Sequence, residues 1–334
     1  MPKIATLGSA LTDVLTKLTS DDVLDQLQLG KGSMTLITAD QFAHLSDMLA
    51  NLPTEVATGG SAANTALCLA HLSDTAQPAA TQVAYICKLN STDRYGQNFL
   101  RTFRSAGVDV TVIPSTDKAS GVCTSFVSPD GERTLATYLG AACDLQADDL
   151  HEGMFAGSDI VYIEGYLVSS HALMQRALTL AHQAGAQVCL DMASYNVVEA
   201  DHDFFHRCVL PQTDIVFANE DEAAAWLPGT PEDALADLAG RCAIAVVKLG
   251  AKGAMARRGS ETARVEAMPV AKVVDTTAAG DFFAAGFLHA YVRGNGLTAC
   301  LKAGAACAGN VIQVMGTKLP PEMWDSLKAK LSIQ

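Results

Sequence analysis

The sequence contains nine cysteines but no C-x-x-C pair, so it lacks the spacing typical of zinc sites and dithiol redox sites. Cys68, Cys189, Cys300 and Cys307 stand among apolar or alanine-rich neighbours. In such surroundings a cysteine behaves as a small buried hydrophobe. This usage favours a protein of the reducing cytoplasm.

Positive charge is scarce as well. Lysine and arginine number 23 against 36 aspartates and glutamates, the formal net charge is −13, and no basic cluster occurs. A nucleic-acid partner is therefore not expected. A small anionic ligand is still compatible with this charge, because a few local amides and cations outweigh a distant negative field.

Long hydrophobic runs are also missing, although 49% of the residues are hydrophobic. No run reaches the length that crosses a bilayer, so no membrane partner is expected. The apolar stretch within residues 1–8 is short and ends in polar residues, which indicates a first β-strand and not a signal peptide. We expect a soluble protein with ample material for a large core.

Strand and helix patterns alternate along most of the chain. Strands are predicted at 3–8, 82–87, 108–113, 160–163, 187–190, 215–218 and 244–249, and Ala-rich helices at 280–293 and 297–314. Repeated βα units predict a three-layer α/β fold, with a mainly parallel central sheet covered by helices on both faces. We expect one domain over residues 1–334.

A β-hairpin interrupts this alternation. Residues 122–128 and 133–138 flank the turn Pro129-Asp130-Gly131, which is a strong hairpin signal. We interpret it as part of a small β-sheet lid, formed by insertions at about 9–38 and 117–142.

The most informative stretch is Asp275-Thr276-Thr277-Ala278-Ala279-Gly280-Asp281, which leads directly into an apolar helix. Small residues at a helix N-terminus leave backbone amides accessible, and the helix dipole favours an anion there. Asp281 could then accept a proton from an attacking hydroxyl. An ordinary acidic N-cap is the alternative.

Three further turns follow predicted strands. They are Gly59-Gly60 with Asn64 nearby, Asn219-Glu220-Asp221-Glu222, and Lys248-Leu249-Gly250-Ala251-Lys252-Gly253. The first lacks the lysine of a Walker loop and is not G-x-G-x-x-G. Each alone is explained almost as well by a plain turn or by helix capping. Their shared place at the carboxyl ends of strands favours one ligand site.

Together these motifs resemble the ribokinase-like (PfkB) carbohydrate and nucleoside kinases. The run 275–281 is similar to the family's D-T-x-G-A-G-D signature, Gly59-Gly60 with Asn64 to its early glycine motif, and Asn219-x-x-Glu222 to its N-x-x-E motif. Lys248-x-Gly250-x-x-Gly253 resembles its nucleotide-side turn. The match covers almost the whole chain, with one departure: Ala278 stands where the signature has its first glycine. A methyl group is tolerable there if φ is negative.

The resemblance implies an ATP-dependent kinase that uses Mg²⁺, and K⁺ as in some relatives. It makes Asp281 the general base and the amides of Ala278, Ala279 and Gly280 the anion hole. The resemblance also implies that the substrate is bound by Asp13, Gly59, Gly60 and Asn64. It implies nucleotide binding by Asn219, Glu222, Lys248, Gly250, Gly253, Asn310 and Arg133. Glu222 would contact Mg²⁺ through water, and Asp275 would contact a monovalent cation. A solvated hairpin charge is an equally good interpretation of Arg133.

The N-terminal region and residues 137–142 resemble adenosine kinases more than ribokinases. We therefore expect phosphoryl transfer to a nucleoside 5′-hydroxyl, with adenosine first. A sugar or sugar acid (fructose, ribose or 2-keto-3-deoxygluconate) is the alternative, and a non-catalytic nucleoside-binding protein a third. A purine needs an apolar wall, for which Leu11, Leu36, Phe126 and Tyr138 are candidates. The protein could be a monomer or a homodimer.

Overall fold

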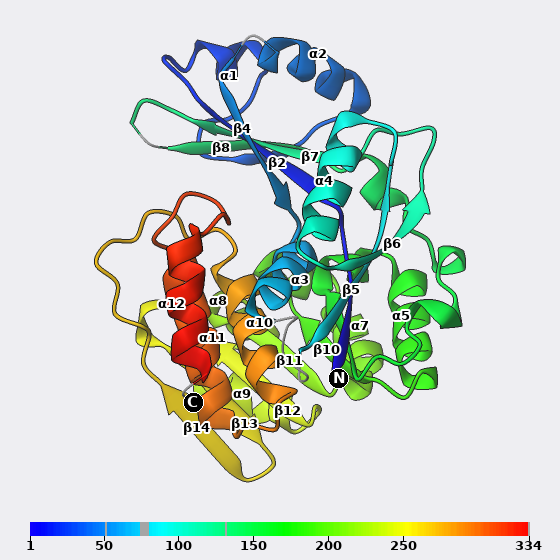
Figure 1. The fold of residues 1–334 in the computed structure, drawn as a ribbon, viewed down its shortest axis with the longest axis vertical. Coiled ribbons are helices and arrows are strands. Elements are labelled where there is room, and N and C mark those ends of the chain that lie inside the picture. Colours follow the sequence, from blue (N-terminus) through cyan, green and yellow to red (C-terminus); the bar gives the residue numbers. More distant parts are fainter. Residues whose placement is uncertain (51, 74–79, 131, 333–334) are drawn as a thin grey trace.

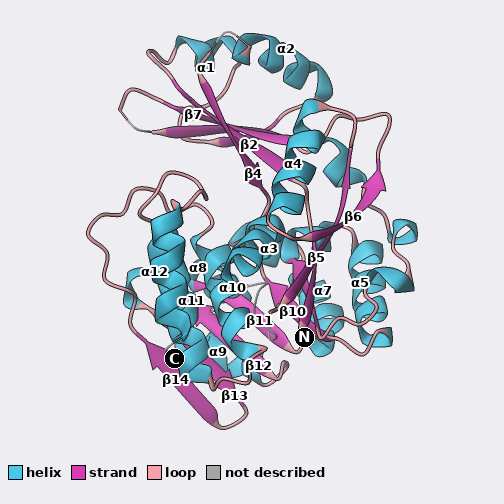
Figure 2. Cartoon of the chain, viewed as in Figure 1, coloured by secondary structure: helices cyan, strands magenta, loops and turns pink. Residues whose placement is uncertain are grey.

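The computed structural model describes residues 1–50, 52–73, 80–130 and 132–332. Gly131, in the predicted hairpin turn, lies outside the described residues. Figures 1 and 2 show a large α/β unit below a smaller sheet, with the first helices of the chain on top. This division agrees with the predicted fold class.

The large sheet has nine strands in the order β14-β13-β12-β11-β10-β9-β1-β5-β6. Seven strands run parallel, and β13 and β14 add an antiparallel edge. Their bounds are Lys3–Leu7 (β1), Gln82–Leu89 (β5), Asp109–Pro114 (β6), Ile160–Glu164 (β9), Gln187–Asp191 (β10), Ile215–Asn219 (β11), Ile244–Lys248 (β12), Ala254–Arg258 (β13) and Glu261–Val265 (β14).

Helices cover both faces of this sheet, because its central strands are apolar on both sides. One face carries α3 (Ser61–Leu72), α4 (Arg94–Ser105), α10 (Ala279–Tyr291), α11 (Leu297–Val311) and α12 (Pro321–Ser332). The other carries α5 (His171–Gln183), α6 (Tyr195–Ala200), α7 (His202–Phe204), α8 (Glu220–Trp226) and α9 (Pro231–Ala239). All the predicted strands and helices above are confirmed; α6, α7, α9 and α12 were not predicted.

The smaller sheet has the order β3-β8-β7-β2-β4. It comprises β2 (Leu11–Lys17), β3 (Met34–Leu36), β4 (Thr54–Gly59), β7 (Gly121–Val127) and β8 (Arg133–Tyr138), with α1 (Asp22–Gln26) and α2 (Ala39–Leu49) over it. We call this the small-sheet unit. The β7–β8 hairpin is confirmed, and β4 joins the sheet in addition to the two predicted insertions. The unit has a hydrophobic core of its own, which includes Phe42 and Phe126.

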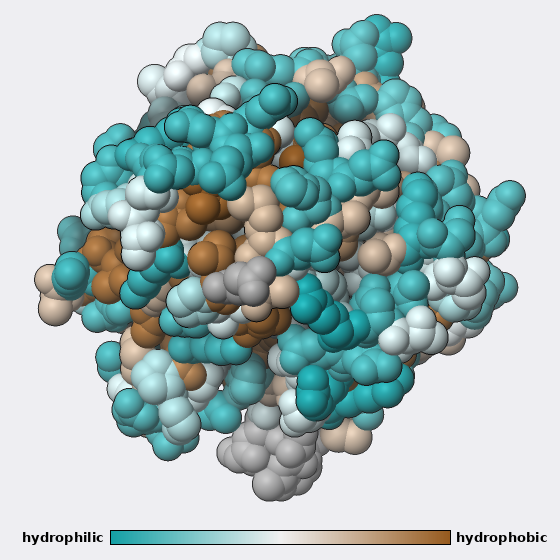
Figure 3. Space-filling view, turned by 90° about the horizontal axis from the view of Figure 1, so that it is seen from above, coloured by the Kyte–Doolittle hydropathy of each residue, from teal (hydrophilic) through white to brown (hydrophobic). Residues whose placement is uncertain are grey.

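Seen from above, hydrophilic side chains cover most of the molecule, and hydrophobic ones gather in the left half of that face (Figure 3). Among the described residues, no helix combines the length and the hydropathy that a membrane crossing requires. All nine cysteines are free thiols, and Cys143 is the exposed one.

Candidate active site

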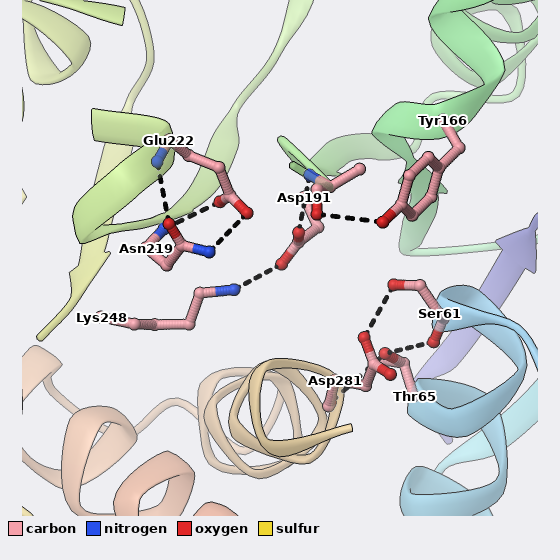
Figure 4. A network of polar contacts seen from close by, with 9 residues as sticks. Ser61, Thr65, Tyr166, Asp191, Asn219, Glu222, Lys248 and Asp281 are labelled. Atoms are coloured by element: carbon pink, nitrogen blue, oxygen red, sulfur yellow. Dashed lines mark hydrogen bonds and ion pairs between the residues drawn. The ribbon is translucent and has the colours of Figure 1, made fainter. Parts of the chain in front are cut away.

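Four adjacent strands end in polar residues at one edge of the large sheet, and a fifth, β1, lies beside them. In spatial order β12, β11, β10 and β9 end at Lys248, Asn219, Asp191 and Glu164, and β1 is followed by Gly8 and Ser9. Carboxyl ends of parallel strands form the usual ligand edge of such sheets. Helices α10 and α3 both begin over this row, so the site lies between the row and those two helix N-termini (Figure 4).

Asp281, in the first turn of α10, is held by the first turn of α3. Ser61 Oγ donates to Asp281 Oδ1 at 2.7 Å, and Asn64 Nδ2 donates to Oδ2 at 2.9 Å. Thr65 Oγ1 also donates to the Asp281 carbonyl oxygen at 3.3 Å. These contacts join two predicted motifs that lie more than 200 residues apart and fix the carboxylate in one orientation.

Withdrawal from water raises the pKa of Asp281 from 3.8 to about 7, although the hydrogen bonds from Asn64 and Ser61 favour its charged form. The carboxylate of Asp191 acts in the same direction as burial, and Lys248 opposes it. A carboxyl group with a pKa near neutrality is well suited to accept a proton during turnover.

The N-terminus of α10 leaves backbone amides unused. In the described part of the chain, the amides of Ala278 and Gly280 have no protein acceptor, whereas Ala279 N–H donates to Thr276 O at 3.2 Å. The predicted anion hole therefore has two of its three amides available. The Ala279 amide is engaged by the tight turn that precedes the helix, and its place in the anion hole stays a prediction.

Ala278 adopts φ 61° and ψ 9°, the left-handed conformation. The methyl group of Ala278 was expected to be tolerated if φ is negative, but the observed φ is positive. An L-residue with a Cβ in this region costs roughly 1–2 kcal/mol relative to its ordinary conformation. This chain thus keeps the backbone shape that suits glycine without having glycine there.

Replacing Ala278 with glycine should raise the free energy of unfolding by about 1 kcal/mol, because it relieves this conformation. Ala279→Gly is the matched control. Its neighbouring position is helical, so that change should lower stability by about 0.5–1 kcal/mol. Urea unfolding of both variants measures the difference. Equal losses in the two variants would show that Ala278 is unstrained.

A cavity of about 720 Å³ opens beside the unused amides. Lys248, Gly250 and Gly253 line it, together with Asn219, Ala279 and Gly280. Many of its other lining residues are apolar, namely Met268, Val270, Val273, Phe283, Ala305, Ala308 and Ile312. A lining that combines the start of a helix with apolar side chains suits a nucleotide, whose phosphates favour the amides and whose base favours apolar contact.

Packing of the chain also requires glycine at position 253. Its φ is +92°, and a Cβ there would lie 1.9 Å from Val265 O on the neighbouring strand. Gly250, at φ +54°, has no such obstruction. The two glycines predicted on the nucleotide side thus line the cavity, but only one is required by the packing around it.

Asn219 and Glu222 form a capping box at the start of α8. The Asn219 amide and Nδ2 donate to the two Glu222 carboxylate oxygens at 2.8 and 2.7 Å, and the Glu222 amide donates to Asn219 Oδ1 at 2.8 Å. Glu222 is buried, which raises its pKa to about 7 against the opposing effect of Lys248. Asn219 lines the cavity, whereas Glu222 does not.

Asn310 is placed differently from the prediction. Its side chain is buried, and its Nδ2 donates to Ala306 O at 2.8 Å within α11. The cavity is lined by Ala305, Ala308 and Gly309 of α11 and by Ile312, which directly follows this helix. Asn310 is thus held within its own helix, and a direct nucleotide contact from it is not supported.

On the other side of Asp281, Gly59 and Gly60 make room for the small-sheet unit. A Cβ on Gly59 would lie 2.3 Å from Asp13 Oδ1, and one on Gly60 would lie 2.2 Å from Ser9 O. The carboxylate of Asp13 therefore lies directly against the glycine turn. Burial, with a smaller effect of Asp275, raises its pKa to about 6.

Arg133 connects the small-sheet unit to the loop before α10. Its NH1 and NH2 donate to the two carboxylate oxygens of Asp275 at 3.0 and 3.1 Å, and NH1 also reaches Thr277 Oγ1 at 3.2 Å. Gly316 N–H donates to Asp275 Oδ2 at 2.8 Å. Thr277 donates to Asp275 Oδ1 as well, from its amide at 3.0 Å and from its hydroxyl at 2.8 Å. Asp275 thus has a guanidinium, two amides and a hydroxyl as partners, and the monovalent cation stays a prediction.

Two buried acids in the row escaped the sequence analysis. Glu164 accepts hydrogen bonds from Ser9 N–H at 2.8 Å and Ala62 N–H at 3.1 Å, which ties the end of β1 to the start of α3. Asp191 forms an ion pair with Lys248 at 2.8 Å. The sequence does contain a signal for these two acids, because each stands directly after a run that is predicted to be a strand.

This arrangement has the parts of a phosphotransferase that acts on an alcohol: a carboxylate base, free amides at a helix N-terminus, a nucleotide-sized cavity and a facing polar loop. The model of the pfkB family carbohydrate kinases matches residues 32–324. The chain belongs to this family.

Similar proteins include both nucleoside and sugar enzymes. The crystal structure of adenosine kinase from Sinorhizobium meliloti is 32% identical, with a TM-score of 0.83 and coverage of 98% of this chain and 99% of that one. A probable sugar kinase from Rhizobium etli CFN 42 is 31% identical, with a TM-score of 0.82 and 98% coverage of both chains. Adenosine kinase from Saccharomyces cerevisiae is 26% identical over 96% of this chain and 97% of its own length. The fold is ribokinase-like, and family membership implies the use of ATP.

Proposed function

We propose that this protein transfers the γ-phosphoryl group of ATP to the primary hydroxyl of a nucleoside, with the 5′-hydroxyl of adenosine as the first candidate. The observation that carries the proposal is the Asp281 carboxylate. Ser61 and Asn64, which follow the glycine turn packed against Asp13, hold this carboxylate, and the preceding residue Gly280 lines the nucleotide cavity. A donor and an acceptor bound on these two sides would meet at that carboxylate.

In the proposed step the acceptor oxygen bonds to the γ-phosphorus while the bond from that phosphorus to the β,γ-bridging oxygen breaks. The acceptor proton passes to Asp281, and ADP leaves with the electron pair of the broken bond. The free amides of Ala278 and Gly280 donate to oxygens of the transferred group. Because the transition state of phosphoryl transfer is loose, positioning and charge neutralisation supply most of the catalysis.

Magnesium fits this site as a companion of the nucleotide. Among the described residues no group of three acidic, histidine or cysteine side chains could hold a metal by itself. Mg²⁺ usually keeps several waters and needs only one or two carboxylates beside the phosphates. Glu222, which is hydrogen-bonded to Asn219, is the residue we assign to it through water. Bound there, the ion would neutralise phosphate charge.

On the acceptor side, Asp13 is suited to bind two vicinal hydroxyls, because one carboxylate accepts two hydrogen bonds. Of the four candidates for a purine wall, Phe126 is fully buried and Tyr138 stacks on Phe42 at 4.6 Å, so both belong to the core of the small-sheet unit. The purine wall stays a prediction, with Leu11 and Leu36 as its candidates outside this core. We propose that the small-sheet unit closes over the acceptor as a lid.

Incubation with MgATP and a panel of nucleosides and sugars tests the acceptor. ADP formation should be fastest with adenosine. Faster turnover with fructose, ribose or 2-keto-3-deoxygluconate would replace the nucleoside by a sugar and leave the phosphotransferase intact. Tight adenosine binding without turnover of any panel member would sink the kinase proposal.

The pH profile provides an independent test of the base. The pKa of Asp281 is raised to about 7 in the free protein, so kcat/KM should rise with pH and level off above about 7, as the carboxyl group loses its proton. Ser61→Ala removes a hydrogen bond that favours the charged form, so it should move this limb to higher pH. Ser260→Ala, at an exposed turn, is the control. A limb that stays in place in Ser61→Ala would assign it to another group.

A further inference from the structure

The ion pair between Asp191 and Lys248 lies in the centre of the row of strand ends (Figure 4). Lys248 Nζ is 2.8 Å from Asp191 Oδ2, and the side chains are 13% and 6% exposed. Asp191 Oδ1 accepts a hydrogen bond from Ala193 N–H at 3.0 Å. Ala193 itself has φ 69°, so the loop after β10 adopts a strained shape that holds this carboxylate.

The ammonium of Lys248 lies directly against the anion-hole loop. A Cβ built on Gly280 would be 3.0 Å from Lys248 Nζ. The space that a side chain at position 280 would occupy is therefore next to the Lys248 ammonium. Position 280 directly precedes Asp281. This contact gives Gly280 a role beyond flexibility, because its missing side chain lets positive charge approach the free amides.

Only one hydrogen bond of this ammonium has a partner within the described residues, the one to Asp191. An ammonium has three donors, so two remain for a ligand. Lys248 also lines the nucleotide cavity. The carboxylates that face it are Asp191 from β10, Glu222 from α8 and Asp281 from α10. Burial acts to lower the pKa of Lys248, but these carboxylates outweigh it and hold that pKa above its usual range.

We infer that Lys248 is a further catalytic residue, whose ammonium contacts the phosphoryl group during its transfer from ATP, and that Asp191 is the residue that positions it. The inference rests on the proposed function. A cation fixed beside the free amide of Gly280 faces the oxygens on which negative charge spreads in the transition state. Lys248 keeps its proton throughout, and no bond to it forms or breaks.

Lys248→Met keeps most of the side-chain length and removes the charge. We expect kcat to fall by roughly 10²–10³-fold, the usual loss for one donor to a developing oxyanion, with the acceptor KM within a few-fold of wild type. Lys248→Arg should recover part of kcat. Lys252→Met is the matched control, because Lys252 is an exposed lysine on the same turn that pairs with Glu220. An unchanged kcat in Lys248→Met would overturn the inference.

Asp191→Asn tests the positioning role with an isosteric change. It should lower kcat by about 10-fold and leave the KM for ATP nearly constant, because the nucleotide still binds while the ammonium loses its fixed place. A rise in KM with unchanged kcat would overturn this role. Thermal unfolding by circular dichroism identifies a folding defect in either variant. If Lys248→Met is defective, Lys248→Gln, which also removes the charge, takes its place in the kinetics and in the nucleotide titration below.

Nucleotide binding in the absence of an acceptor separates this inference from the proposed function. Titration with Mg²⁺ and either ADP or the non-hydrolysable analogue AMP-PNP requires no turnover. Lys248→Met should weaken AMP-PNP at least 10-fold and ADP little, because only AMP-PNP carries the γ-phosphoryl group. In Lys248→Arg the affinities for AMP-PNP and ADP should be unchanged or should fall by the same factor. Equal weakening by Lys248→Met would overturn the inference, even if the acceptor is identified correctly.

Discussion

Asp281→Asn should reduce kcat by roughly 10²–10⁴-fold, the range expected when a positioned base is removed. Asparagine has nearly the same shape and can still accept from Ser61, but its amide group cannot take the acceptor proton. Nucleotide affinity should change little, because the cavity is lined by Ala279 and Gly280 and not by the Asp281 side chain. Steady-state kinetics of ADP formation and an ADP titration measure the two effects.

Asp40→Asn is the matched control for this change. Asp40 is also an acidic residue in the first turn of a helix, but it is exposed on α2 in the small-sheet unit. It should lose no activity. If Asp281→Asn retained wild-type kcat, Asp281 would not be the base, and the hydrogen bonds from Ser61 and Asn64 would have only a structural role.

Gly60→Ala should lower the free energy of unfolding by at least about 2 kcal/mol and raise the acceptor KM, because two effects add. Gly60 has φ 102° and ψ 135°, a region almost confined to glycine, and a Cβ there would lie 2.2 Å from Ser9 O. The obstructing atom is backbone, so it cannot move away cheaply. The expected displacement involves the start of α3, which carries Ser61 and Asn64.

Gly107→Ala separates the two effects. Gly107 also has a positive φ, +80°, but a Cβ there would meet nothing within 4 Å. Its cost should therefore be the conformational one alone, about 1 kcal/mol, with activity unchanged. Urea unfolding and acceptor kinetics on both variants measure the contrast. Equal destabilisation would mean that the chain near Ser9 adapts to the added methyl group.

The large sheet and the approximate site could be predicted because both follow from local pattern. Buried parallel strands are recognisable as apolar runs, and the residues after them converge at one edge of a sheet. This reasoning brought Asp281, Asn219 and Lys248 together correctly. It also indicated that the small residues at 278–280 open a helix, which the structure confirms.

Pairings across the fold could not be predicted in this way. Arg133 and Asp275 are 142 residues apart, and nothing local to either indicates the other. The same holds for Asp191, whose partner Lys248 lies two strands away in the sheet. The left-handed φ of Ala278 opposes the ordinary helical preference of alanine, because the turn from Thr276 fixes the backbone there. The side chain of Asn310, which was expected to reach the nucleotide, instead donates to the carbonyl of Ala306 in its own helix.

The contact between Arg133 and Asp275 has a thermodynamic consequence. Arg133 belongs to the unit that carries Asp13, and Asp275 belongs to the loop that presents the amides of Ala278 and Gly280. A ligand that orders either partner also alters the equilibrium of the other. Linkage then requires reciprocity: the factor by which nucleotide changes acceptor affinity equals the factor by which acceptor changes nucleotide affinity. We therefore expect the ion pair to couple nucleotide binding to acceptor binding.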